Sequence, residues 1–265
     1  MPRCRTTCSI ACRQRCERTV LPLLERIAEL DAGVMLDAGC GDGETARRIV
    51  EAVGAVKRLV LVDIDAAALD EARDQFEGLA DRLEVAFRVA DVTQLPFAAD
   101  SFDSVLLSDV LHHSGDPQQA LTQCARVLKP AGILLFSEMV CDELSGPEAV
   151  GRDLHHFKSA IDRLCGVPHQ NTLPRPVIEA ALASAGFETL WWQRERFDPA
   201  RPADPDGRRR IAAREQFLET YLEHAEQLPQ YASLRKQAAF LNYRMLRCGF
   251  TEAPELRVIA RKLAI

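Results

Sequence analysis

The stretch VMLDAGCGDGETARRIV, Val34 to Val50, joins a short apolar run to a helical pattern through a turn with three glycines at alternate positions. Glycine lets a backbone come close to a ligand, and the helix that follows begins with unpaired N–H groups. A glycine turn between a strand and a helix is typical of proteins that bind nucleotide-like molecules. The stretch therefore predicts an α/β fold with a ligand at this turn.

The spacing and the charge of the turn argue against a phosphate ligand. A dinucleotide fingerprint needs a glycine where this chain has Glu44, and a Walker A loop needs a lysine that is missing here. Asp37, Asp42 and Glu44 crowd the turn and would repel a pyrophosphate. They suit S-adenosylmethionine, which carries an ammonium and a sulfonium. Its carboxylate is small enough to meet backbone N–H groups at a helix start.

Apolar, strand-like segments alternate with helical ones along the first half of the chain. The strands are predicted at 34–37, 58–63, 83–90, 103–108 and 132–138, and the helices at 44–53, 66–79 and 117–128, the last stopped by Pro130. Continuous apolar strands separated by helices indicate a parallel sheet that is covered on both faces. We therefore expect an α/β, doubly wound fold.

An acidic residue stands at the end of each of the first three predicted strands: Asp37, Asp63 and Asp91. Asp63 stands 24 residues after the first glycine of the turn, near the spacing expected of an acid that binds ribose hydroxyls. Ile64 is placed to cover an adenine, and Asp91, followed by Val92, to accept from its amino group. Strand ends meet at one edge of an α/β sheet, so we expect these acids at the ligand. Helix capping is the alternative, which we prefer for Asp65.

Four segments resemble, in order and spacing, the motifs of the class I S-adenosylmethionine-dependent methyltransferases, across about residues 33–140: VMLDAGCGDGETARRI, LVLVDID, VADVTQLPFAADSFDSVLLSDVLHH and ALTQCARVLKPAGILLFSE. The nearest subgroup is the small-molecule type that includes the ubiquinone and menaquinone methyltransferases. The resemblance implies a mostly parallel seven-stranded sheet with an antiparallel last strand. One departure is Ala131, where the family often has a glycine.

The resemblance also implies roles for individual residues. The turn, with Asp37, Gly39, Cys40 and Gly41, would hold the methionine end of the cofactor. The adenosine end and the reacting methyl would be met by Asp63, Ile64, Asp91, Val92 and Ser108.

Domain organisation is predicted from the same pattern. Residues 1–31 form an N-terminal helical extension, and residues 32–265 form the methyltransferase domain. Two helical insertions interrupt this domain, a lid at about 141–172 and a second insertion at about 200–250. A helix at 176–185 and a strand at 187–197 lie between them. The final segment ELRVIARKL is expected to be the last strand, beside the strand at 187–197.

Five of the six histidines lie between His112 and His169. We take them as candidates for the general base and for contacts with the methyl acceptor. Histidine can take a proton from an acceptor near neutral pH. We predict His113 and His156 as catalytic residues, and His112, His155 and His169 as acceptor-binding residues. A metal held by the histidines at 112, 113, 155 and 156 with Asp109 or Asp153 is an alternative, but their spacing matches no ligand motif, so we predict no metal.

The cysteines leave further alternatives open. Cys4, Cys8, Cys12 and Cys16 are four residues apart, so on a helix they would share one face and could hold a metal. That segment also has features of a transit peptide. Cys40, Cys141 and Cys165 are the thiols that an arsenic-type acceptor would need.

The composition of the chain limits the kinds of partner that we expect. The chain of 265 residues has a formal net charge of −6, which argues against nucleic acid, and no apolar run long enough to span a bilayer. Its nine scattered cysteines are not a disulfide framework, which predicts the cytoplasm. Aromatic residues after position 208 could line a pocket or a homodimer contact. We predict a small-molecule acceptor; a non-catalytic cofactor-binding protein and an RNA or protein methyltransferase are the alternatives.

Overall fold

The computed structural model describes residues 32–53, 56–79 and 82–264. The predicted helical extension at 1–31 and the four cysteines within it lie outside the described residues. Among the described helices, none is both long enough and apolar enough to cross a membrane.

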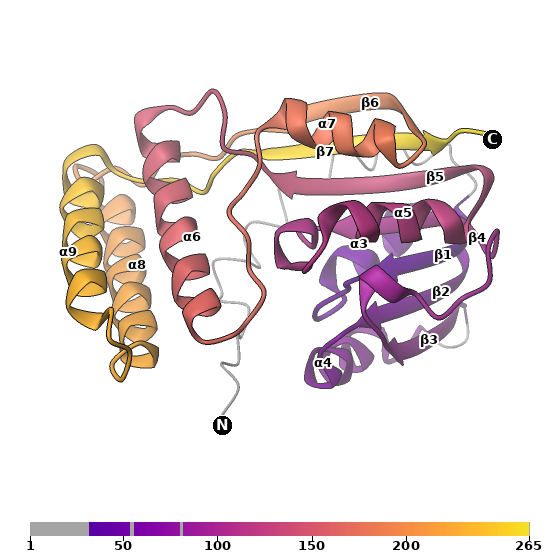
Figure 1. Cartoon of the computed structure of the whole chain (residues 1–265), viewed down its shortest axis with the longest axis horizontal. Coiled ribbons are helices and arrows are strands. Elements are labelled where there is room, and N and C mark those ends of the chain that lie inside the picture. The colour runs from indigo at the N-terminus through magenta and orange to yellow at the C-terminus, as the bar shows by residue number, and fades with distance from the viewer. Residues whose placement is uncertain (1–31, 54–55, 80–81, 265) are drawn as a thin grey trace. The chain divides into compact units, whose positions relative to one another are not determined.

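Seven strands form one sheet in the order β3-β2-β1-β4-β5-β7-β6 (Figure 1). The strands are β1 Gly33–Ala38, β2 Val56–Asp63, β3 Glu84–Val89, β4 Phe102–Ser108, β5 Leu128–Met139, β6 Phe187–Glu195 and β7 Glu255–Lys262. The pairs β1–β2, β1–β4, β2–β3 and β4–β5 are parallel. Figure 1 shows β7 pointing opposite to β5. The predicted fold class is confirmed, and β7 lies beside β6 as predicted.

Helices follow the strands in the alternation that the sequence predicts. One group of helices comprises α3 Glu44–Val53, α4 Ala66–Phe76, α5 Pro117–Val127 and α7 Arg175–Ser184, together with the single turns η1 Val92–Gln94 and η2 Leu111–His113. The remaining helices are α6 Gly146–Leu164, α8 Pro205–His224 and α9 Tyr231–Cys248.

Both faces of the sheet are covered, because consecutive residues of β1 are buried although their side chains point to opposite faces. Met35 and Leu36 are each 0% exposed. The face of Met35 packs against α3 and α4 through Ile49 and Phe76, which belong to the same apolar cluster. This burial fixes where each strand ends, and therefore which side chains reach the edge of the sheet.

Two boundaries differ from the sequence-based expectation. Helix α4 ends at Phe76, before Gly78, whose φ of 84° suits a residue without a Cβ. Strand β5 begins at Leu128, directly after α5, so Pro130 lies within the strand and not in a turn before it. Ala131 takes a φ of 60°, so this alanine adopts the left-handed conformation at the position where the family resemblance leads us to expect glycine.

The chain divides into two compact units. The described part of the helical unit is residues 139–175 and 194–256, and that of the sheet unit is residues 32–53, 56–79, 82–138, 176–193 and 257–264. Helices α6, α8 and α9 share a core, which includes Leu154 and Phe157 of α6, Leu218 of α8 and Leu241 of α9. Gly151 is needed where α6 meets the segment after α9, since a Cβ there would lie 1.8 Å from the carbonyl oxygen of Thr251. The two predicted insertions therefore build one bundle; the lid role of 141–172 remains a prediction.

Candidate active site

The glycine turn leaves β1 at the edge of the sheet where the parallel strands end. The backbone nitrogens of Gly39 and Cys40 donate hydrogen bonds of 2.7 and 2.9 Å to the carbonyl oxygen of Val62, the next-to-last residue of β2. The turn is thus fixed to the neighbouring strand through its backbone. Further backbone nitrogens of the turn bond within the protein, since that of Gly43 donates to the carbonyl oxygen of Cys40 at 2.9 Å and that of Glu44 to Oδ1 of Asp42 at 3.2 Å.

Two glycines of the turn are required for different reasons. Gly39 has a φ of 88°, and a Cβ there would lie 2.5 Å from Cγ2 of Val110, in the loop after β4. Gly41 has a φ of 54°, and a Cβ there would meet nothing within 4 Å. Gly39 therefore lets two loops of the sheet unit pack together, whereas Gly41 lies beside open space.

Asp63 ends β2 and ties the turn to the following helix. Its Oδ2 atom accepts a hydrogen bond of 2.9 Å from the backbone nitrogen of Gly41, and its Oδ1 atom accepts one of 2.9 Å from that of Asp65. The next side chain, Ile64, is 68% exposed although it is apolar. The ribose contact expected of Asp63 and the adenine contact expected of Ile64 stay predictions.

Asp37 is the strongest electrostatic feature of the site. Its side chain is buried, at 2% exposure, and its Oδ2 atom has no hydrogen-bond partner within the described part of the chain. Burial raises the pKa of Asp37 well above its usual value, and the nearby Asp63 and Asp42 raise it further. A buried carboxylate held among other carboxylates is unfavourable by itself and would be stabilised by a cationic ligand.

The acids after β2 and β3 also serve as helix caps. Asp65 caps α4 by accepting from the backbone nitrogen of Ala67, which confirms the prediction for this residue. Asp91 caps η1, because its Oδ1 atom accepts from both the backbone nitrogen and the hydroxyl of Thr93, each at 2.7 Å. Val92 is buried next to it. The adenine contact predicted for Asp91 would therefore be made by an acid that this cap already holds in place.

Cys40 cannot act as a ready nucleophile. The side chain is buried, and burial raises the pKa of its thiol strongly, with further increases from Asp37 and Asp63. The thiol is therefore protonated at neutral pH. Cys141 and Cys165, the other thiols of the arsenic alternative, belong to the helical unit.

The end of β4 brings hydroxyl groups and a strained residue to the same edge. The hydroxyls of Ser108 and Ser137, which are paired between β4 and β5, lie 2.7 Å apart. Asp109 follows with a φ of 55°, which is uncommon outside glycine. Such strain is concentrated at functional sites and is maintained by the surrounding structure, here a hydrogen bond from the Asp109 nitrogen to the Ser137 carbonyl.

A buried histidine–glutamate pair lies directly beyond these serines. His112, in η2, and Glu138, near the end of β5, are 4% and 2% exposed. The Nδ1 atom of His112 lies 2.5 Å from Oε1 of Glu138, whose Oε2 atom also accepts from the backbone nitrogen of His112 at 3.4 Å. Sequence reasoning missed Glu138, although an acid that follows an apolar strand is the signal used for Asp37 and Asp63.

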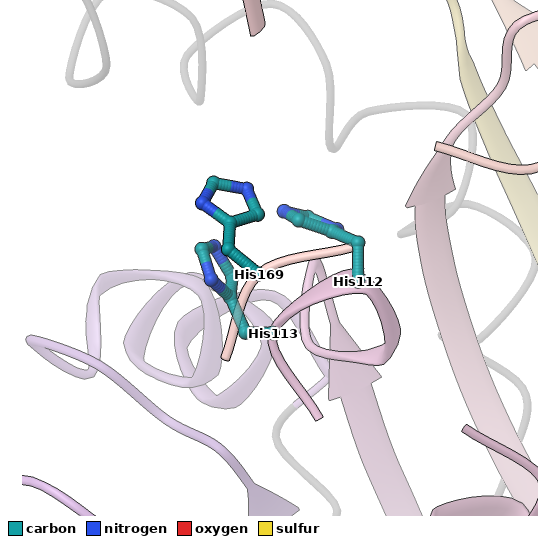
Figure 2. A group of neighbouring side chains, drawn as sticks. All are labelled: His112, His113 and His169. Carbon is teal, nitrogen blue, oxygen red and sulfur yellow. The ribbon is translucent and has the colours of Figure 1, made fainter. Parts of the chain in front are cut away.

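His113 is exposed, in contrast to its neighbour. Its ring centroid lies 4.2 Å from that of His112, at an interplanar angle of 44° (Figure 2). Figure 2 also labels His169, which belongs to the helical unit and is described with it.

The helical unit contains a chain of hydrogen-bonding partners around His169. This side chain is 1% exposed, and its Nδ1 atom lies 2.7 Å from Oδ2 of Asp162. Its Nε2 atom lies 3.1 Å from Nε2 of His155, and Lys158 donates to Asp162 at 2.8 Å. Burial alone would raise the pKa of Asp162, but hydrogen bonds from His169 and Lys158 lower it below the usual value. Residues 155, 158 and 162 share one side of α6, which the helical spacing could have indicated.

His156 has a different environment from His155. Its Nε2 atom accepts from the backbone nitrogen of Thr172 at 3.2 Å and lies 2.9 Å from the Thr172 hydroxyl. Burial, followed by the charge of Arg152, lowers the pKa of His156 to about 4, so the ring is neutral at physiological pH. Asp153, one acid of the metal alternative, is held in ion pairs with Arg152 and Arg244.

The structure therefore brings the predicted cofactor residues together and divides the histidines. The cofactor residues lie at or just beyond the ends of β1, β2, β3 and β4. Two of the five candidate histidines belong to the sheet unit, and the three others, His155, His156 and His169, belong to the helical unit. The catalytic and acceptor roles assigned to them stay predictions.

Comparison with known proteins identifies the class. Residues 36–136 match the family model described as a methyltransferase domain. This stretch begins in β1 and ends in β5, so it contains the glycine turn and the strand ends described above. This part of the chain is therefore a methyltransferase domain, which supports the class I S-adenosylmethionine-dependent type that the sequence motifs predict.

Several curated relatives cover the same region. The methyltransferase GfsG of Streptomyces halstedii is 35% identical over 47% of this chain and 44% of its own length. An O-methyltransferase of Pyrenophora dematioidea is 31% identical over 51% of this chain and 50% of its own length. The ubiquinone/menaquinone biosynthesis C-methyltransferase UbiE of Vibrio parahaemolyticus is 31% identical over 58% of this chain and 64% of its own length. The chain thus spans about half the length of the first two relatives.

Solved structures agree on the fold. A candidate methyltransferase of Bacillus halodurans superposes with a TM-score of 0.63 at 19% identity, covering 92% of this chain and 99% of that one. An S-adenosylmethionine-dependent methyltransferase of Methanosarcina mazei superposes with a TM-score of 0.58 at 17% identity, covering 92% of this chain and 98% of that one. The [4+2]-cyclase SpnF superposes with a TM-score of 0.56 at 21% sequence identity, covering 94% of this chain and 84% of that one. The same fold is therefore also found in a protein named for a different reaction.

Proposed function

We propose that this protein transfers the methyl group of S-adenosylmethionine to a small organic molecule. The observation that carries the proposal is the unpartnered carboxylate oxygen of Asp37, buried beside the glycine turn. Burying a carboxylate without a partner is costly, and the neighbouring acids increase the cost. A cationic ligand would offset it, whereas a phosphate would increase it further.

The residues at the strand ends fit this cofactor. Asp37 would receive the ammonium group, and the open space beside Gly41 admits a ligand against the backbone. Asp63, held by two backbone N–H groups, would receive the ribose hydroxyls, and Ile64 offers an exposed apolar side chain to the adenine. When bound, S-adenosylmethionine supplies a methyl group on a positively charged sulfur.

The protein's own contribution is alignment and exclusion of water. Alignment of two reacting groups can lower a barrier by about 7–11 kcal/mol. The rigid pairing of Ser108 with Ser137 and the fixed left-handed turn at Asp109 are the features of β4 that would set the geometry around the methyl position. His113 and His156 remain our sequence-based candidates for removing a proton from the acceptor.

A small acceptor is supported by the relatives and by the chain itself. Named relatives include an O-methyltransferase and C-methyltransferases of ubiquinone and menaquinone biosynthesis. The net charge of −6 does not favour a polyanionic acceptor. From the last residue of β4 the sequence reads SDVLHH, without the Asn/Asp-Pro-Pro-aromatic element that orients the amino group of a nucleobase. We propose that residues 141–172 contribute to acceptor binding and that the reaction takes place in the cytoplasm.

The test uses the full chain with S-adenosylmethionine labelled in its methyl group. We expect saturable binding of S-adenosylhomocysteine by calorimetry and transfer of label into a small-metabolite extract. Binding without any transfer would support a non-catalytic cofactor-binding protein. Label that enters RNA or protein and not the small metabolites would overturn the small-molecule acceptor, and no binding of either cofactor form would overturn the proposal.

A further inference from the structure

The outer side of α9 carries three large apolar side chains that the helical unit does not cover. Phe240, Tyr243 and Leu246 are 60%, 58% and 52% exposed. They are spaced by three residues, so they form one row along the helix. Leu241 and Met245 of the same helix are buried in the core that α9 shares with α6 and α8. Single exposed apolar residues are ordinary, but a continuous row of them on one helix indicates an interaction surface.

The two neighbouring helices carry opposite charges. Helix α9 contains four basic residues and no acidic one: Arg235, Lys236, Arg244 and Arg247. The second half of α8 contains three glutamates spaced by four residues, which therefore share one side of the helix: Glu215, Glu219 and Glu223.

Some of these charges are used within the chain and others are not. Arg244 forms an ion pair with Asp153 of α6. The side chains of Arg235 and Lys236 on α9, and of Glu219 and Glu223 on α8, are exposed. Within the residues that the structure describes, none of these four side chains has a hydrogen-bonding or charged partner. The two helices thus offer a basic and an acidic surface that do not neutralise each other in one molecule.

The hairpin formed by α8 and α9 places these charges at one of its ends. The two helices share a core and are joined by residues 225–230, so they pack antiparallel, as Figure 1 shows. The acidic end of α8 therefore lies level with the basic start of α9. Exposed small residues of α8, Ala212 and Ala213, lie towards the other end of the hairpin, where Leu246 projects from α9.

From this arrangement we propose that the outer face of the α8–α9 hairpin binds the same face of a second copy of this chain. A two-fold axis along the hairpin places α8 of each copy over α9 of the other. Glu219 and Glu223 of one copy then meet Arg235 and Lys236 of the other, and symmetry repeats the contact. The apolar row of α9 packs on the partner's α8, with Leu246 against the small side chains.

The size of the face suits such an interface. The helices contain 20 and 18 residues. Two adjacent helices of this length cover about 30 Å by 20 Å. This is the scale of a specific interface, which buries about 800 Å² on each partner. The arginines at the start of α8 are held locally, since Arg208 donates to the carbonyl oxygen of Ala203 at 2.9 Å and Arg209 to Asp206 at 3.2 Å.

An anionic membrane is the other partner that a basic helix with exposed aromatic side chains can fit. It fits less well here, because the glutamates on the neighbouring helix would be repelled by anionic lipids. The net charge of −6 adds to that repulsion. A second copy, in contrast, uses both the basic and the acidic helix.

The first test measures the mass of the full chain by sedimentation velocity over a range of micromolar concentrations. We expect a dimer. Tyr243→Asp should raise its dissociation constant at least about 30-fold, because this variant places a charge at the middle of the apolar row. Val177→Glu is the control, since it alters an exposed apolar residue of the sheet unit and should leave the dissociation constant unchanged. Circular dichroism checks that both variants fold. A monomeric wild type, or a dimer that Tyr243→Asp leaves intact, would overturn the proposal.

The second test asks whether α8 of one copy faces α9 of the other. One variant carries Glu219→Lys with Glu223→Lys, and the other carries Arg235→Glu with Lys236→Glu. Each alone should self-associate about tenfold more weakly or worse, because like charges then meet at both contacts. An equal mixture of the two should form a dimer with one copy of each, which native mass spectrometry detects. Unchanged self-association of either variant, or a mixture that stays monomeric, would refute the arrangement.

Vesicles that contain phosphatidylserine test the membrane as partner. We expect the full chain not to sediment with them. Binding to the vesicles that Tyr243→Asp abolishes would assign the apolar row to a lipid surface and would overturn the proposal.

Discussion

The Oδ2 atom of Asp63 lies 2.9 Å from the backbone nitrogen of Gly41, so the end of β2 holds the glycine turn that follows β1. The same carboxylate accepts from the nitrogen of Asp65 through Oδ1. Asp63 is therefore both a candidate cofactor contact and a structural link between two loops. A substitution there tests both roles, and the control must separate them.

Asp63→Ala should weaken cofactor binding without unfolding the sheet. Hydrogen bonds to a charged group contribute about 1.5–3 kcal/mol, so we expect the Kd for S-adenosylhomocysteine to rise about 10- to 100-fold. Calorimetry measures the affinity, and circular dichroism the fold. Asp65→Ala removes the cap of α4 and should cost about 1 kcal/mol of stability while leaving the Kd unchanged. Equal affinities in Asp63→Ala and the wild type would contradict the assignment.

Gly41→Ala should reduce cofactor affinity as well as stability. Gly41 and Gly78 both have a positive φ, and a Cβ on either meets nothing within 4 Å. Each alanine substitution should therefore cost about 1–2 kcal/mol of unfolding free energy from backbone strain. Only Gly41→Ala places a methyl group beside the cofactor turn, so only this variant should lose affinity, about tenfold or more by calorimetry. A similar loss in Gly78→Ala would show that strain alone is responsible.

Asp37→Asn should stabilise the ligand-free protein and weaken cofactor binding. The pKa of Asp37 is raised in the folded state, so the folded protein binds more protons than the unfolded one above about pH 3.9, the ordinary value. The ionised side chain thus lowers stability increasingly as pH rises from about 4 through the folded pKa. We expect Asp37→Asn to be more stable than the wild type at pH 7 by about 1 kcal/mol or more, since a tenfold change in proton affinity corresponds to about 1.4 kcal/mol.

Urea unfolding at pH 7 and near pH 4 measures this difference, which should shrink at the lower pH. Asp42→Asn is the comparison, because Asp42 belongs to the same turn but is not buried. If Asp37→Asn binds S-adenosylhomocysteine as tightly as the wild type, Asp37 does not receive the ammonium group.

His156→Gln should remove a pH-dependent contribution to stability. The folded pKa of His156 is about 4, below the ordinary value of about 6.5, so the neutral ring is favoured in the folded state. That contribution is fully present above about pH 6.5 and is lost as pH falls towards 4. We therefore expect the stability advantage of the wild type over His156→Gln to shrink between pH 7 and pH 4.5 in urea unfolding. A difference that is constant with pH would contradict the assigned environment.

The same variant tests the catalytic role predicted for His156. A catalytic histidine would lower turnover more than cofactor affinity, with the acceptor found in the metabolite extract. An unaltered turnover would remove His156 from the catalytic residues and leave it as a structural partner of Thr172.

Local sequence patterns predict the sheet well because its strands and helices are regular and its ligand loops follow strand ends. Helix 44–53 and the acids at 37, 63 and 91 follow from apolar periodicity and from the rule that parallel strands end at one edge. The partner of His112 was not predicted, since it depends on the lateral pairing of β4 with β5. The contact between His155 and His169 was missed for a similar reason, because it depends on how the segment after α6 folds back along that helix.

The order of strands and helices has a consequence for how the protein is made. Strand β7 is synthesised after β6, yet it lies between β5 and β6, so the sheet is complete only when residues 255–262 have left the ribosome. The helical unit depends on a similar delay, because the apolar face of α6 packs against α8 and α9, which follow it only after α7 and β6. A nascent chain that stalls before Pro205 would expose both an open sheet edge and an uncovered helix, which makes it a substrate for chaperones and proteases.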